Sequence, residues 1–209
     1  HGLFGMLDNW HQMASRFSEH FNVITVDLRN HGQSPHTDQM NFALMAEDVK
    51  VLMDDLKLES AYLLGHSMGG KTAMVFADIY PELLDKLVVV DIAPKEYTGG
   101  HEVYFNAFEQ IDFSQFDRRK QADEALMQHE KNSAVRLFLL KNLSRAEKGY
   151  KLKINLSTIR SFYPDMIKAV DFQWVISTPT LFVKGDKSGY IQEDDQADIL
   201  EQFPNARFV

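Results

Sequence analysis

The chain contains no cysteine, and this absence excludes several kinds of chemistry. Without a thiol there is no disulfide, no cysteine nucleophile and no thiolate metal site. No stretch approaches the roughly 20 consecutive apolar residues that a membrane-spanning helix requires. No group of His, Asp and Glu residues has the spacing of a metal site, so we expect no bound metal.

Positive charge is also scarce, with 22 Lys and Arg against 30 Asp and Glu and a net charge of −8. This balance disfavours nucleic acid and anionic membranes as main partners. The length of 209 residues, with 44% apolar and 25% charged residues, suits one sizeable globular core. No secretory signal peptide precedes the first motif, and we predict a cytoplasmic location.

Short apolar runs alternate with amphipathic ones along most of the chain. The runs have little polar alternation, which is typical of strands in a parallel sheet flanked by helices. The predicted strands are Phe21–Asp27, Ala61–Gly65, Lys86–Asp91, Pro179–Lys184 and the start of one at Ala206–Val209. The predicted helices between them are Asn41–Leu58, Met68–Tyr80 and Glu193–Phe203.

The alternation stops between about residues 95 and 174, where charged and aromatic residues increase. Helical patterns near 101–110, 119–129 and 133–142 predict a helical cap inserted into the sheet domain. We therefore predict a core of residues 1–94 and 175–209 and a cap of 95–174. The chain begins at a turn that strands of the sheet should precede. It ends in a predicted strand that should be followed by a further element of the fold. We therefore expect truncation at both ends.

The most informative motif is Gly-His-Ser-Met-Gly-Gly at residues 65–70. It lies between a predicted strand and a predicted helix, the setting in which G-x-S-x-G forms a sharp turn that presents a serine hydroxyl. Gly65 and Gly69 flank Ser67 because larger side chains would collide with the neighbouring strand and helix. The pattern predicts Ser67 as a nucleophile.

Acyl transfer by a serine also needs main-chain donors for the oxyanion. The N–H of Met68, at the start of the helix, is one predicted donor. His1-Gly2-Leu3-Phe4-Gly5 is a candidate for the turn that carries the second, and we assign that donor to the N–H of Leu3. Taken alone, this stretch is more often an ordinary glycine-containing loop, and it is the downstream GHSMGG that favours the oxyanion turn.

Two aspartates compete for the role of orienting the base. Asp91 ends one predicted strand, and Asp186 follows the next, so both lie where open α/β sheets place their ligands. The usual chain order is serine, then acid, then histidine. His101 and His129 both fall in the predicted cap, and no histidine follows Asp186. We expect the catalytic histidine outside these residues.

Lys71 follows the last glycine of the motif, in the first turn of the predicted helix. A cation is unfavourable at this positive end of the helix dipole. We therefore expect a carboxylate from the Asp-Ile-Ala-Pro loop (91–94), or from the cap, to pair with Lys71.

At this level the sequence resembles the α/β-hydrolase family, and more narrowly its YbfF-like esterase branch. The resemblance spans essentially the whole chain. The stretches that carry it are HGLFG (1–5), VDLRNHGQSP (26–35), GHSMGGKTAM (65–74) and LVVVDIAP (87–94), with weaker agreement at FLLKNL (138–143) and GDKSGYI (185–191).

The resemblance implies hydrolysis of carboxylic esters or acyl thioesters, including acyl-CoA, with no metal or organic cofactor. It favours Asp91 as the acid, although Asp186 departs from the branch's pattern and keeps the assignment open. Two alternatives remain: a carbon–carbon hydrolase or perhydrolase with the same triad, and a non-catalytic small-molecule-binding protein on this fold. The acyl length, leaving group, pathway and oligomeric state do not follow from the sequence.

Overall fold

The structure is a computed structural model that describes all 209 residues. The chain divides into two compact units. Unit 1 contains His1–Leu3, Met40–Tyr97 and Asp165–Val209, and unit 2 contains Phe4–Gln39 and Thr98–Pro164. The division into a core and a cap at residues 95–174 stays a prediction.

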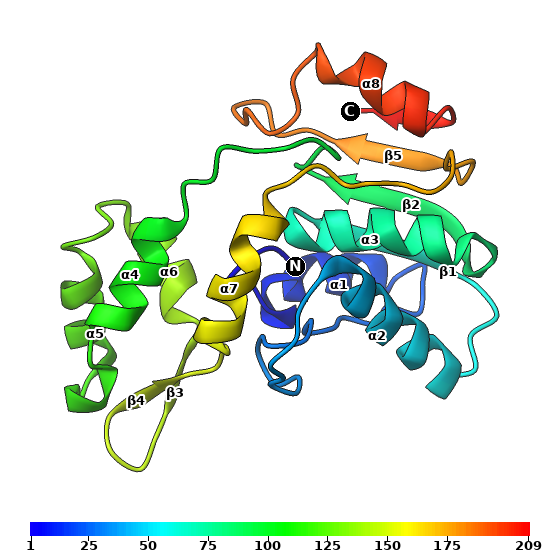
Figure 1. The fold of residues 1–209 in the computed structure, drawn as a ribbon. Coiled ribbons are helices and arrows are strands. Elements are labelled where there is room, and N and C mark those ends of the chain that lie inside the picture. The colour runs from blue at the N-terminus through cyan, green and yellow to red at the C-terminus, as the bar shows by residue number, and fades with distance from the viewer. The chain divides into compact units, whose positions relative to one another are not determined.

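Unit 1 is built on a four-stranded sheet, part of which is labelled in Figure 1. Its strands lie in the order β1 (Ala61–His66), β2 (Leu84–Val90), β5 (Thr180–Val183) and β6 (Ala206–Phe208). All neighbouring pairs run parallel. The predicted parallel sheet and its strands from Ala61 onward are confirmed.

Three helices belong to unit 1: α2 (Phe42–Asp55), α3 (Met68–Ile79) and α8 (Asp195–Gln202). Their positions confirm the predicted helices to within a few residues. Asn41 begins α2 because its side-chain oxygen accepts the N–H of Leu44 at 2.7 Å, an N-cap bond. A short 3₁₀ turn, η2 (Pro81–Leu83), follows α3.

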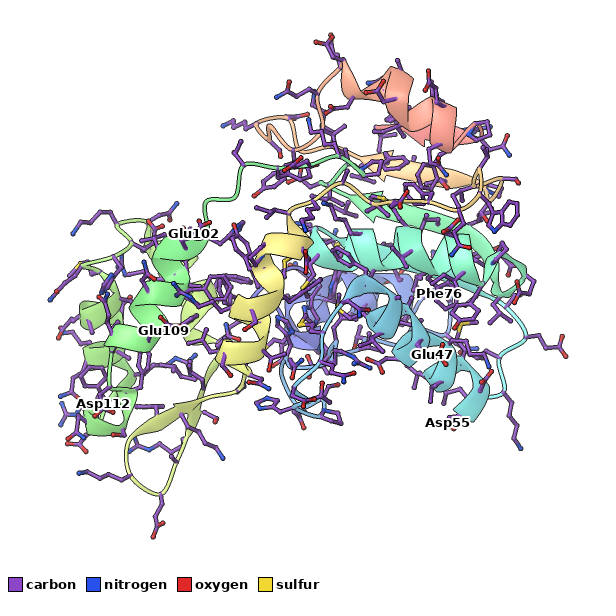
Figure 2. All side chains as sticks on the ribbon, viewed as in Figure 1. Glu47, Asp55, Phe76, Glu102, Glu109 and Asp112 are labelled. Atoms are coloured by element: carbon purple, nitrogen blue, oxygen red, sulfur yellow. The ribbon has the colours of Figure 1, made fainter.

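Helix α2 packs along α3, and Figure 2 labels Glu47 on the first and Phe76 on the second. Phe76 is fully buried. At the end of α3 the Tyr80 hydroxyl donates to the Glu47 carboxylate. The two helices are therefore joined by an apolar contact surface and by a polar contact at its rim.

One face of the sheet carries the core of unit 1. Val89 pairs with Phe182 across β2 and β5, so both side chains point to the same face, and both are fully buried. Phe203, directly after α8, packs edge-on against Phe182 with ring centroids 5.4 Å apart. Gly70 of α3 lies against Val89, so α3 and α8 cover the same face.

The second segment of unit 2 contains the helices α4 (Glu102–Gln110), α5 (Arg119–Leu126) and α6 (Ser133–Leu140). They confirm the three predicted helical patterns, and Figure 2 labels Glu102 and Glu109 on α4. Phe4 packs against two rings of α4, at 4.9 Å from Phe105 and 5.4 Å from Phe108. This aromatic cluster forms part of the core of unit 2.

Several elements were not predicted. They are η1 (Leu7–Asn9), α1 (His11–Phe17), η3 (Phe113–Gln115), the antiparallel pair β3 (Leu143–Arg145) and β4 (Tyr150–Leu152), and α7 (Leu156–Met166). Helix α7 contains Pro164, a residue that normally signals a helix end. The two strands have three residues each, too few for a period to be recognised. None of the helices combines the length and apolar composition needed to cross a membrane.

The predicted buried strand Phe21–Asp27 is wrong. These residues form no strand, and the Phe21 and Ile24 side chains are 52% and 51% exposed. Strand preference mainly reflects packing against neighbouring strands and burial, and no strand pairs with this segment. A β-branched run without such neighbours therefore stays irregular.

The expected carboxylate partner of Lys71 is also wrong. The Lys71 side chain is buried, at 2% exposure, and its three N–H groups donate to main-chain carbonyls. The acceptors are Lys95 O at 3.1 Å, Met166 O at 3.2 Å and Lys168 O. Burial lowers the pKa of Lys71 from 10.5 to about 8, and the charge of Glu96 opposes part of this shift.

The lowered pKa of Lys71 predicts a pH dependence of stability. Between about pH 8 and 10.5 the unfolded chain binds this proton and the folded chain releases it, so the free energy of unfolding rises with pH. The wild-type protein should gain up to about 3 kcal/mol over Lys71→Met across this range. Urea unfolding of both proteins at pH 7 and pH 10 measures the difference, and an unchanged difference would contradict the shifted pKa.

Two adjacent residues of α8 test which face of the helix packs. Ile199 is 1% exposed and belongs to the core of unit 1, whereas Leu200 is 42% exposed. Ile199→Ala should lower the free energy of unfolding by about 2–5 kcal/mol because it leaves a cavity. Leu200→Ala, the matched control, should change it by less than about 0.5 kcal/mol. Equal effects in urea unfolding would show that α8 is placed incorrectly.

Candidate active site

Ser67 lies at a sharp bend between the end of β1 and the start of α3. Its backbone angles, φ 53° and ψ −117°, are ones that non-glycine residues rarely adopt. Such a conformation costs on the order of 1–3 kcal/mol and needs support from its surroundings. The Ser67 N–H donates to Val90 O at 3.0 Å, and the Ser67 carbonyl accepts the N–H of Lys71 at 3.0 Å.

The glycines around Ser67 are required by close backbone contacts. A β-carbon at Gly65 would lie 2.1 Å from the carbonyl oxygen of Gly69, at the start of α3. A β-carbon at Gly69 would lie 2.6 Å from the carbonyl oxygen of His1. The predicted steric role of both glycines is confirmed. The group that Gly69 avoids is the turn at residues 1–3, and not the neighbouring strand or helix named in the prediction. Gly70, whose β-carbon would lie 2.5 Å from Ile92 Cγ2, has a similar role that the sequence analysis missed.

The turn at the start of the chain lies directly against Ser67. A β-carbon at Gly2 would lie 3.1 Å from Cβ of Ser67 and 3.3 Å from Nδ1 of His66. The N–H of Gly69 donates to His1 O at 3.0 Å and ties this turn to α3. The N–H groups of Leu3 and Met68 donate to no other group in the hydrogen bonds of the structure. Their role as oxyanion donors remains a prediction.

Asp91 occupies the position that corresponds to Ser67 on the neighbouring strand. His66 pairs with Val90, so Ser67 and Asp91 each follow directly after this pair of residues. Asp91 also has a positive φ of 53°, and its N–H donates to Val183 O at 2.8 Å. Its half-buried carboxylate accepts the N–H of Gly185 at 3.4 Å.

Asp186 is placed less favourably for acting on the same serine. It is exposed, and it follows β5, which adjoins β2 and not β1. The sheet order thus puts Asp91 one strand away from the bend and Asp186 two strands away. This arrangement favours Asp91 as the acid, and the assignment stays a prediction.

No histidine of the chain is hydrogen-bonded to the Ser67 hydroxyl. His66 points toward Gly2, and burial lowers its pKa while the Asp91 carboxylate partly opposes the shift. In unit 2, His101 Nδ1 lies 3.1 Å from the Tyr163 hydroxyl, and burial lowers the pKa of His101 as well. His129 also belongs to unit 2. The expectation that the catalytic histidine lies outside these residues therefore stays a prediction.

Comparisons with known proteins identify the family to which the chain belongs. A family model described as the alpha/beta hydrolase fold matches residues 1–209. The chain is 36% identical to "Esterase YbfF" of Escherichia coli over 209 residues, covering 99% of this chain and 80% of that protein. It is 37% identical to "sn-1-specific diacylglycerol lipase ABHD11" of Danio rerio over 215 residues, covering 99% and 68%.

A solved structure described as "Marine microorganism esterase" superimposes with a TM-score of 0.97 at 39% identity. The match covers 100% of this chain and 83% of that one. The predicted α/β-hydrolase fold and the resemblance to esterases are thereby confirmed. This chain belongs to the alpha/beta-hydrolase family, on its esterase branch.

Proposed function

We propose that this protein is a serine hydrolase that cleaves carboxylic esters or acyl thioesters through an acyl-enzyme on Ser67. The observation that carries the proposal is the strained bend at Ser67, with Gly2 packed against it and two unused amides nearby. A backbone held in this conformation is typical of functional sites. The esterase and lipase names of the relatives support the same reaction class.

In the proposed reaction, the Ser67 oxygen attacks the acyl carbonyl while a histidine base accepts the hydroxyl proton. Asp91 orients that base through a carboxylate–imidazole hydrogen bond. The N–H groups of Leu3 and Met68 stabilise the oxyanion, and each such donor typically contributes about 100- to 1,000-fold in kcat. The base then gives the proton to the leaving alcohol or thiol. In the second step the base activates a water molecule, which attacks the acyl-enzyme and releases the carboxylic acid product and the free Ser67 hydroxyl.

The substrate class is proposed at two levels. Hydrolysis of carboxylic esters has the stronger support, because the relatives' names include an esterase and a diacylglycerol lipase. Thioesters, including acyl-CoA, undergo the same attack with a thiol as leaving group and are the finer proposal. Both reactions use only side chains and main-chain amides, so the proposal includes no metal or organic cofactor.

Ser67→Ala tests the nucleophile. We expect kcat for a p-nitrophenyl ester and for an acyl-CoA thioester to fall by roughly 10⁴- to 10⁶-fold in the full-length protein, because no acyl-enzyme forms. A fluorophosphonate probe should label the wild-type protein and not the variant. Ser60→Ala, at the opposite end of β1, is the matched control and should be labelled normally. An unlabelled wild type would favour a non-catalytic binding protein, and labelling of Ser67→Ala would place the reactive nucleophile at another residue.

Asp91→Asn and Asp186→Asn, compared side by side, test the acid. We expect Asp91→Asn to lower kcat by about 10⁴-fold because the base loses its orienting carboxylate. Asp186→Asn should have a much smaller effect, since Asp186 is exposed and a strand further from Ser67. The measurement is kcat for ester hydrolysis together with the urea midpoint. The reverse ranking would transfer the acid role to Asp186.

A further inference from the structure

The hydroxyl of Tyr97 bridges two loops at the carboxyl end of the sheet. It accepts the N–H of Ala93 at 2.7 Å, in the loop after β2, and donates to Tyr190 O at 2.8 Å, in the loop after β5. Both of its hydrogen-bonding capacities are therefore used on main-chain groups. Because the two loops leave neighbouring strands, this bridge sets their spacing.

These are the same two loops that meet at Asp91. The Asp91 carboxylate accepts the N–H of Gly185, and the Gly185 carbonyl accepts the N–H of Ser188 at 2.9 Å. The Ser188 hydroxyl in turn accepts the N–H of Tyr190 at 3.2 Å. A continuous set of hydrogen bonds thus runs from the Tyr97 hydroxyl through the second loop to the Asp91 carboxylate.

The direction of the Asp91 carboxylate depends on its contact with the loop after β5. Its main chain is held in a positive-φ conformation by the bond from its N–H to Val183 O. Its carboxylate, in contrast, has one described hydrogen bond, the 3.4 Å contact with Gly185. A bond this long is weak, so the spacing of the two loops decides whether the carboxylate keeps its direction.

The Tyr97 ring is itself held firmly. The ammonium groups of Lys71 and Lys95 lie 5.1 Å and 5.6 Å from its centroid, within the range of cation–π attraction. Lys95 is fixed by both oxygens of Asp195, and the Tyr97 N–H donates to Ile167 O at 2.8 Å. Burial raises the pKa of Tyr97, so its hydroxyl remains a donor across the working pH range.

We propose that Tyr97 is a positioning residue, which holds the loops after β2 and β5 at the spacing that directs the Asp91 carboxylate. The proposal rests on the proposed function, in which Asp91 orients the base. In this proposal Tyr97 acts only through the position of Asp91, because its hydroxyl is bonded to the main chain of Ala93 and Tyr190. Loss of its hydroxyl should therefore reduce kcat and leave substrate binding nearly unchanged.

Tyr97→Phe in the full-length protein tests this role, because it removes the bridging hydroxyl and keeps the ring. We expect kcat to fall roughly 10- to 100-fold, the effect of a small misplacement in a catalytic site, with KM within about two-fold. Tyr80→Phe is the matched control: it also removes a hydrogen-bonded tyrosine hydroxyl, at the far end of α3, and should leave kcat unchanged. Urea midpoints of both variants account for any loss of folded protein.

The double variant Tyr97→Phe/Asp91→Asn separates the two proposals. If Tyr97 acts through Asp91, the double variant should be no slower than Asp91→Asn alone. Full activity of Tyr97→Phe, or a full additional loss in the double variant, would overturn the role of Tyr97 and leave that of Asp91 intact. Wild-type activity of Asp91→Asn would instead overturn both roles.

Discussion

The close approach of two backbones at Ser67 is the constraint on which the site depends. The end of β1 and the first turn of α3 come so near that a methyl group at Gly65 would overlap the carbonyl of Gly69. The turn at His1 and Gly2 packs against the same point from another side. This crowding holds Ser67 in a conformation it would otherwise avoid and brings the amides of Leu3 and Met68 to its vicinity.

Two of the non-glycine residues with positive φ lie at the ends of neighbouring strands. Ser67 and Asp91 both have φ values of 53°, and each directly follows one member of the His66–Val90 pair. The next strand stabilises each bend, since Ser67 donates to Val90 and Asp91 donates to Val183. The parallel sheet is therefore the support that maintains two unfavourable conformations side by side, and its core on one face supplies the required stability.

Lys71 shows how the fold accommodates a charge in an unfavourable place. Lys71 lies in the first turn of α3, and its ammonium donates to main-chain carbonyls and not to a carboxylate. Three carbonyls from the segments around Lys95 and Lys168 surround it, and the same ammonium lies over the Tyr97 ring. The Lys71 ammonium thereby joins α3 to the segment that contains Lys95 and Tyr97 and to the segment around Lys168.

The sequence by itself determined the local elements: the G-x-S-x-G bend at Ser67, the parallel strands from Ala61 onward and the helices that follow them. These follow from short-range patterns, because periodicity and glycine placement act within a few residues. Tertiary structure decided three further features. It left Phe21–Asp27 without a neighbouring strand, it supplied the carbonyls that accept hydrogen bonds from Lys71, and it placed the Tyr97 hydroxyl between two loops. Each of these depends on residues that are distant in the chain, such as Tyr97 and Tyr190. No local pattern encodes such pairings, since they arise only when the sheet brings its loops together.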